Sequence, residues 1–190
     1  MSLTSAPYGL IPVEKLGANP NQGGGQRAYP VTADVAYPMA VGQLATLTAG
    51  VIGVPSAAPT AGTVIGVITG FDFTDPIMKY AVQDSLLPLN AVTAGFTNIK
   101  VFVNDDPHQL YKVQADGVMN QSKIGTKVDI VGNQTSTPAV KRGAGKAASA
   151  GGTTLQVVGF FDTPASKPGD LYTDIIVKIA AAMHIYTATA

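Results

Sequence analysis

Short runs of alternating or continuous apolar residues recur along most of this chain, and Gly and Pro separate them. Val, Ile, Thr and Phe dominate these runs, as expected for the half-buried surface of a β-sheet. The runs are residues 44–48, 64–73, 99–104, 110–115, 127–131, 154–161 and 173–179. Many short strands separated by turn residues predict an all-β fold, with one β-sandwich or barrel-like domain.

Residues 101–117, VFVNDDPHQLYKVQADG, show the strand pattern most clearly: a strand, a tight turn and a second strand. Before the turn, Ile99, Val101 and Val103 share one face, because side chains alternate along a strand. After the turn, the apolar residues alternate with Lys112 and a glutamine. We therefore expect each of these two strands to place one face in the core and the other face outside it.

Residues 77–87 leave helix and strand both open. Asp75 is a suitable N-cap and Pro76 a suitable first helical residue, which favours a helix. The same segment read as a strand places Met78, Tyr80 and Val82 on one face. The pattern does not decide between them, and we favour the strand because the family resemblance described below implies extended structure here.

The first 29 residues differ from the rest of the chain in their high Gly and Pro content, which excludes a helix or a central strand. We predict an extended N-terminal arm over residues 1–29, followed by a β-rich domain over residues 30–190. The arm also carries apolar residues that a solvated tail does not need: Tyr8, Leu10, Ile11 and Val13. Either its own domain or a neighbouring chain could hold it. We favour a neighbour, because ordering a loose segment needs contacts to offset the lost entropy.

Residues 133–152 are rich in Gly, Ala, Ser and Thr and predict a long flexible loop or a projecting hairpin. Within them, residues 141–146 (KRGAGK) have the lysine and glycines of a phosphate-binding loop. That motif requires Gly at position 140 and Ser or Thr at position 147, where this chain has Val140 and Ala147. A basic loop tip that touches an acidic neighbour is the simpler interpretation.

Charged residues make up only 13% of the chain, and the formal net charge is zero. A surface that partly faces other proteins and a neutral Thr/Ser/Gln surface explain this equally well. The chain has no basic excess to indicate a nucleic-acid partner. Residues 35–71 carry no charge, but Gly and Pro interrupt them too often for a membrane-spanning helix. Because the start of the chain lacks the pattern of a signal peptide, we expect a protein that does not cross a membrane.

The residues typical of catalysis are scarce: the chain has no cysteine and two histidines. His108 follows Asp105, Asp106 and Pro107, which indicates a β-turn more strongly than a metal or acid–base cluster. Asp105, Asp106 and Asp116 could bind calcium, but their spacing does not match that of a known calcium-binding loop. His184 follows an alanine run and is interpreted as a packing residue. We expect no catalytic residue, no metal site and no cofactor.

Four segments together resemble the capsid decoration (cement) proteins of tailed bacteriophages. They are residues 6–13 (APYGLIPV), 66–76 (GVITGFDFTDP), 101–117 and 157–186 (VVGFFDTPASKPGDLYTDIIVKIAAAMHIY). The first fits an A-x-x-G-L-x-P-V opening, and the last resembles the closing strand of that family. The likeness covers most of the chain but is missing from residues 121–152.

The resemblance implies a non-enzymatic, β-rich protein on the outer surface of the virion capsid, made in the host cytoplasm. Its partners would be the major capsid protein, whose neighbouring subunits it clamps, and further copies of itself, in a homotrimer. We expect the arm residues Tyr8, Leu10, Ile11 and Val13 to contact the capsid. The trimer interface is expected on the strands within residues 154–161 and 173–179, at Val157, Phe160, Ile176 and Lys178.

Two other functions stay open. Another virion structural subunit, such as a tail tube or adaptor protein, suits a neutral β-protein almost as well. A small hydrolase or sugar-binding β-domain should show clustered carboxylates or aromatic residues in a cleft. The absence of Trp and the 7% aromatic content argue against that third function.

Overall fold

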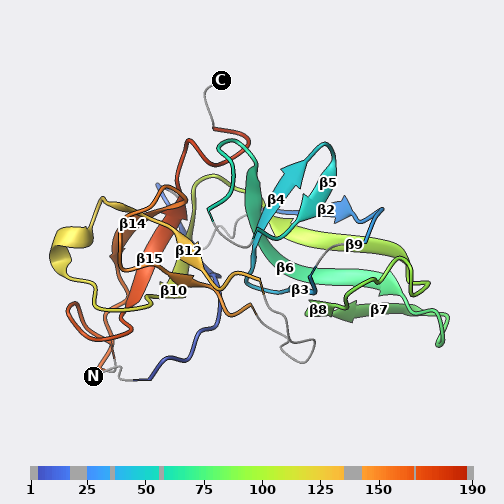
Figure 1. The fold of residues 1–190 in the computed structure, drawn as a ribbon, viewed down its shortest axis with the longest axis horizontal. Helices are drawn as coiled ribbons and strands as arrows, with labels where there is room; N and C mark the ends of the chain where they lie inside the picture. The colour runs from blue at the N-terminus through green and yellow to red at the C-terminus, as the bar shows by residue number, and fades with distance from the viewer. Residues whose placement is uncertain are drawn as a thin grey trace.

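Two antiparallel sheets make up most of this computed structural model (Figure 1). It describes residues 4–17, 25–34, 37–55, 58–134, 143–164 and 166–187. The five-stranded sheet has the order β1 (Ile11–Lys15), β10 (Gln109–Gln114), β15 (Asp174–Ile179), β14 (Leu155–Phe160) and β11 (Lys127–Val128). The six-stranded sheet has the order β2 (Gln26–Pro30), β9 (Thr97–Asn104), β6 (Val64–Thr74), β4 (Leu44–Thr48) and β5 (Val51–Gly53), and β7 (Ala81–Asp84) pairs with β6.

Short elements complete the fold. Two-residue strands form the pairs β3 (Met39–Ala40) with β8 (Leu86–Leu87), and β12 (Ile130–Val131) with β13 (Lys146–Ala147). One short 3₁₀ helix, η1, covers Gln121–Lys123, and the described residues include no α-helix. The predicted all-β class is confirmed, and the arrangement of the sheets is sandwich-like.

Strand β6 contributes to both hydrophobic cores. Val64 and Val67 pack into a first core with the inner face of the five-stranded sheet. Ile65 and Ile68 belong to a second core under the six-stranded sheet. Neighbouring residues of a strand point to opposite faces, and the irregular register against β4 between Ala45 and Thr46 shifts this alternation between Val64 and Val67. A strand that is buried on both faces reads as a nearly continuous apolar run. This explains the uninterrupted pattern of residues 64–68.

The strands β9 and β10 follow each other closely in sequence but lie in different sheets. β9 pairs with β2 and β6, whereas β10 pairs with β1 and β15. The predicted faces are confirmed: Ile99, Val101 and Val103 are buried, as are the apolar residues of β10. The short turn between β9 and β10 is therefore a point where the chain passes from one sheet to the other.

Gly66 allows the close approach of β6 and β9 beside that turn. Its φ is +153°, and a Cβ atom placed there would lie 2.0 Å from the carbonyl oxygen of Asn104. Asn104 is the last residue of β9 and pairs with Val67 of β6. Only glycine fits this contact without moving a main chain.

The described parts of residues 1–29 belong to the domain, and the prediction of a separate arm is wrong for them. β1 pairs with β10, β2 pairs with β9, and Leu10 is 1% exposed within the first core. Gly and Pro do exclude central strands, but both β1 and β2 are edge strands. An edge strand tolerates proline because one of its sides forms no ladder. Residues 1–3 and 18–24 lie outside the described part.

The described ends of the predicted 133–152 loop are packed rather than projecting. Asn133 is fully buried, and its side chain accepts a hydrogen bond from Leu44 N (2.8 Å) and donates one to Leu44 O (3.1 Å). After residue 142, Gly143 N donates to Val41 O, and β13 returns to pair with β12. Residues 135–142 lie outside the described part of the chain.

Between residues 75 and 87 the strand interpretation is confirmed for β7 and β8, while residues 75–80 form a turn. At the other end of the chain, residues 180–187 form what we call the C-terminal strap. Ala180 and Met183 of the strap lie in the first core, and Ile185 packs against the second. His184 is fully buried between them, as expected for a packing residue.

Candidate functional site

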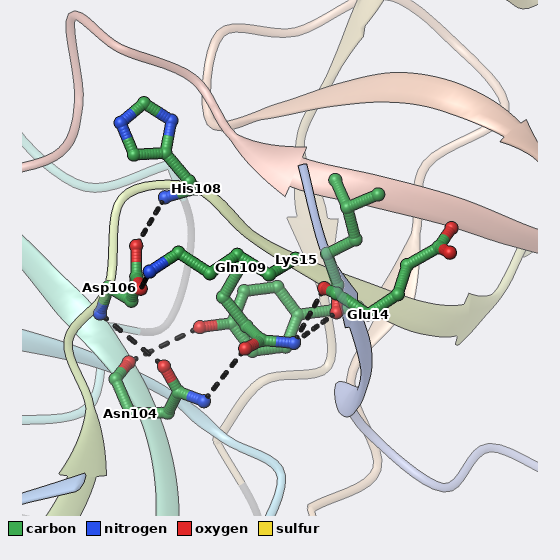
Figure 2. Close-up of polar contacts among 8 residues, drawn as sticks. Glu14, Lys15, Asn104, Asp106, His108 and Gln109 are labelled. Atoms are coloured by element: carbon green, nitrogen blue, oxygen red, sulfur yellow. Dashed lines mark hydrogen bonds and ion pairs between the residues drawn. The ribbon is translucent and has the colours of Figure 1, made fainter. Parts of the chain in front are cut away.

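The turn between β9 and β10 carries a cluster of polar contacts around several of the candidate residues (Figure 2). Asp106 starts a β-turn in which Gln109 N donates to Asp106 O (3.2 Å), with Pro107 in the second position. The Asp106 carboxylate accepts a hydrogen bond from His108 N at 2.8 Å and pairs with Lys15 Nζ at 2.5 Å. Proline favours this position, and an Asp side chain that bonds the main chain two residues later is a common turn device.

The Gln109 side chain connects this turn to β1. Its Nε2 donates to Glu14 O at 2.8 Å, and its Oε1 accepts from Asn104 Nδ2 at 3.3 Å. Tyr111, which is fully buried, donates its hydroxyl proton to Asn104 O at 3.2 Å. The polar groups of the turn are thus used to hold β1, β9 and β10 together.

Asp105 organises a second cluster on the side of β2. Its carboxylate accepts a hydrogen bond from Tyr29 Oη (2.8 Å) and pairs with Arg27 Nε (3.2 Å), although Asp105 itself is only 7% exposed. Tyr186 from the C-terminal strap joins them: its hydroxyl lies 3.1 Å from Tyr29 Oη and accepts from Arg27 Nη1 at 3.3 Å. A buried carboxylate requires such partners, because removal from water is costly.

These contacts perturb the titration of several groups in the two clusters. Burial alone would raise the pKa of Asp106, but the Lys15 ammonium and the hydrogen bond from His108 N lower it below its usual range. Partial burial and hydrogen bonds to Tyr186 and Asp105 raise the pKa of Tyr29. Burial raises the pKa of Tyr111 as well. All three groups therefore keep one protonation state at neutral pH.

The arrangement confirms the turn interpretation of residues 105–108. The two neighbouring carboxylates serve different clusters, and the His108 ring points away from the other labelled side chains (Figure 2). In the described part of the chain, no group of three or more His, Asp or Glu residues is placed to hold a metal ion. The sequence indicated the turn, but not its partners Lys15, Arg27, Tyr29 and Tyr186.

The four predicted capsid-contact residues of the N-terminal segment have different environments. Leu10 is a core residue and is wrong as a contact residue. Tyr8 is partly buried: its hydroxyl donates to Asp174 Oδ1 at 2.8 Å. Ile11 is half-buried on β1, and Val13 is 38% exposed on the same edge strand. Of the four, Val13 is the most accessible to a partner.

Tyr8 belongs to a small cluster on the outer face of the five-stranded sheet. Lys112 Nζ pairs with Asp174 Oδ2 at 3.0 Å and lies 4.2 Å from the ring centre of Phe161 and 5.3 Å from that of Tyr8. Burial, followed by the bond to Asp174, raises the pKa of Tyr8. The N-terminal segment thus covers this part of the sheet, which explains why Gln114 is buried on the outer face.

The predicted trimer-interface residues divide between the two faces of the same sheet. Val157 is 1% exposed in the first core, so its side chain is not available and that prediction is wrong. Phe160 packs partly against the same core, because it pairs with the inward-facing Ile175 across a bulge. Ile176 and Lys178 are half-buried and alternate with the core residues of β15, so they lie on the outer face. These two remain candidates for an interface.

The most exposed apolar residues lie elsewhere, in the connection between β6 and β7, which the sequence interpretation did not select. We call residues 75–80 the hairpin tip; it lies at the right-hand end of the view in Figure 1, far from the five-stranded sheet. Ile77 is 88% exposed, Met78 58% and Tyr80 59%. The available signal was the sequence IMKY directly after an Asp-Pro pair, where a turn would normally be polar.

The hairpin tip has a well-defined backbone. Asp75 Oδ1 accepts hydrogen bonds from Ile77 N (2.7 Å) and Met78 N (2.8 Å), and Lys79 N donates to Asp75 O at 3.0 Å. Next to the tip lies a groove of about 400 Å³, which Met78 and Tyr80 line together with Phe73, Val82, Leu86, Pro88 and Phe96. Asp75 and Asp84 also line this groove, and its other lining residues are mostly apolar, so the tip and the groove share the side chains of Met78 and Tyr80.

The basic loop tip predicted at residues 141–146 falls partly outside the described residues, which exclude 141 and 142. Lys146 lies on β13, where its Nζ donates to Ser5 Oγ at 3.3 Å and lies 5.8 Å from the ring centre of Tyr172. At least this lysine therefore contacts its own domain.

Comparison with known proteins finds no matching family model, no matching curated protein and no matching solved structure. Among the described residues, no helix has the length and apolar character needed to cross a membrane.

Proposed function

We propose that this chain is a phage virion structural protein that decorates and stabilises the icosahedral capsid. In this role it acts without catalysis, on the outer surface of the virion, by clamping neighbouring major capsid subunits. The sequence resemblance described above motivates the proposal. The observation that carries it is the hairpin tip, where Ile77 is 88% exposed and Met78 and Tyr80 more than half exposed.

The tip supports a contact role because its apolar side chains stay in water in the folded domain, so packing of the core does not account for them. Apolar side chains gathered at one place on a surface typically mark a site of interaction with another protein. Asp75 fixes the turn through its bonds to Ile77 N and Met78 N, so little conformational entropy is lost when a partner binds. The tip also begins within the Phe73-Thr74-Asp75-Pro76 motif, one of the segments that carry the resemblance.

The resembling segments also coincide with the framework that supports the tip. They contain β10 and β15 in full and parts of β6, β9 and β14, which are central strands of the two sheets. A protein that must bridge two capsid subunits needs a rigid connection between its contact surfaces. The proposed contacts are the hairpin tip at one end and, at the five-stranded sheet, the exposed edge residue Val13.

The proposal is tested by adding the purified protein to capsid shells of the phage that encodes it, prepared without it. We expect saturable co-sedimentation with a fixed number of copies per shell, and shells that resist heat or low salt better, because binding only the assembled lattice stabilises it. A lack of binding to shells contradicts the proposal. Binding to purified tails instead would indicate a tail tube or adaptor subunit.

A matched pair of variants tests the role of the tip. Ile77→Ser should weaken shell binding at least tenfold, which corresponds to roughly 1.4 kcal/mol. Ile124→Ser makes the same change at an isoleucine that is 41% exposed after η1, far from the tip in sequence, and should bind like the unmodified protein. Equal binding by both variants would remove the tip from the proposed contact.

We also propose that the chain forms a homotrimer, with Ile176 and Lys178 on the outer face of β15 in its interface. Half-buried Ile176 is an apolar residue on the outer face of β15, between the polar residues Asp174 and Lys178 of the same strand face. Light scattering of the isolated protein measures the oligomeric state directly. A monomer at micromolar concentration, together with isolated copies on the capsid, would contradict the trimer.

A further inference from the structure

The C-terminal strap contains a buried histidine. His184 is fully buried, and its Nε2 has no hydrogen-bond partner within the described residues. The main chain of Asp105 lies close to the ring but makes no hydrogen bond of good geometry to Nε2. A buried polar group without a partner is rare in folded proteins and calls for a specific reason.

The strap connects parts of the fold that are distant in sequence. Val64 N donates to Met183 O at 3.0 Å, and Ile185 N donates to Val64 O at 2.8 Å, so the strap lies along the start of β6. Beyond His184, the Tyr186 hydroxyl reaches Tyr29 and Arg27 of β2. The strap thus ties the end of β15 to β6, to β2 and to the Asp105 cluster.

The hydrogen bond at the other ring nitrogen fixes the protonation state of His184. Tyr186 N donates to His184 Nδ1 at 3.2 Å, so Nδ1 is an acceptor and the neutral ring carries its proton on Nε2. If Nδ1 took up a proton, two N–H groups would face each other and this bond would be lost. The observed strap is therefore compatible only with the neutral ring.

Charged and titratable groups surround the ring from each neighbouring element. The turn after β9 supplies Asp105, Asp106 and His108, and the strap supplies Tyr186. From β2, Arg27 and Tyr29 engage the Asp105 carboxylate. From β1, Lys15 pairs with Asp106. Val64, the residue of β6 that faces the strap, is apolar. Both nearby carboxylates already have cationic partners, which weakens their attraction for a proton on His184.

We infer that His184 is an acid-sensitive lock, which holds the Tyr186 end of the strap while neutral and releases it when protonated. Release would also separate Tyr186 from Tyr29 and Arg27 and loosen the Asp105 cluster. Burial lowers the pKa of His184 below its ordinary value, and the nearby carboxylates only partly oppose this. A lowered pKa in the folded state means that the lock is fully closed above about pH 6.5 and weakens as the pH falls below that value. The inference does not depend on the capsid role.

The direct test follows the ring and the strap together by NMR in the intact protein. Long-range ¹H–¹⁵N spectra report the tautomer and the protonation of His184, and amide hydrogen exchange reports the protection of Tyr186. We expect the Nε2–H tautomer at pH 7.5 and a titration below pH 6.5. In the same range, Tyr186 should lose protection at least tenfold after correction for the intrinsic exchange rate. Titration of His184 without loss of protection, or a ring that stays neutral to pH 4.5, would overturn the inference.

Two variants separate the lock from other acid effects. His184→Asn places an amide oxygen near the position of Nδ1 and cannot titrate, so Tyr186 protection should no longer depend on pH between 7.5 and 5. His108→Asn removes the other histidine, which is exposed on the turn, and should keep the acid transition. An acid transition that persists in His184→Asn contradicts the inference. If that variant does not fold, the measurements on the unmodified protein still decide.

Discussion

Two Asp-Pro turns in this protein share their local chemistry but differ in what surrounds them. At the hairpin tip, Asp75 bonds the main-chain N–H of Ile77 and Met78. At the β9–β10 turn, Asp106 bonds the N–H of His108 in the same way. The first turn displays apolar side chains to solvent, whereas the second is enclosed by β1 and by the Asp105 cluster. Local sequence therefore determines that a turn forms, but not whether the rest of the fold encloses it or leaves it exposed.

Long-range partners make the difference. The Asp106 carboxylate pairs with Lys15, and the neighbouring Asp105 is held by Arg27 and Tyr29. At the hairpin tip, the hydrogen bonds of Asp75 with the described residues all lie within its own turn. The β9–β10 turn should thus contribute to the stability of the whole domain, and the hairpin tip only to its own shape.

The largest effect is expected at Gly66, which lets β6 approach the end of β9 next to the enclosed turn. Gly66→Ala would place Cβ 2.0 Å from Asn104 O, so the two main chains must move apart. We expect a loss of at least about 3 kcal/mol of unfolding free energy in urea denaturation. Gly159→Ala is the matched control, because a Cβ at that strand glycine meets nothing within 4 Å. Its effect should stay within about 0.5 kcal/mol, and equal losses for both would refute the proposed contact.

The sequence predicted the strands of the two sheets where β-branched residues alternate or form a continuous run. It missed β1 and β2, because their polar residues, Gly and Pro are compatible with edge strands alone, and edge position depends on the other strands. It also missed the shortest strands, such as β3 and β13, which contain two residues each. Two residues have no periodicity to detect.

The candidate site was predictable only in its local part. The Asp-Pro pair of residues 106 and 107 indicated the turn, and the structure has it. Nothing in residues 101–117 indicated that β9 and β10 join different sheets, or that Tyr29 and Tyr186 meet at Asp105 although 157 positions separate the two tyrosines. The hairpin tip was missed because strand and helix patterns both treat Met78 and Tyr80 as buried-face residues.

An intermediate effect should separate the two aspartates directly. Asp106→Ala removes both the bond to His108 N and the pair with Lys15, at a carboxylate whose side chain is 12% exposed. We expect a loss of about 2 kcal/mol. Asp75→Ala removes bonds within its own turn alone and should cost about 1 kcal/mol. Thermal or urea unfolding measures both. A larger loss for Asp75→Ala would reverse the comparison of the two turns.

The smallest effect is expected when the residues that follow the two prolines are exchanged. Ile77 and His108 both lie immediately after the proline of an Asp-Pro turn, and both side chains are exposed. Ile77→His and His108→Ile should each change the unfolding free energy by less than about 0.5 kcal/mol, because neither side chain supports the core. Urea unfolding of the two single variants measures this. If Ile77→His instead destabilised the isolated domain, the exposed tip would serve folding, and its apolar residues would no longer require a binding partner to explain them.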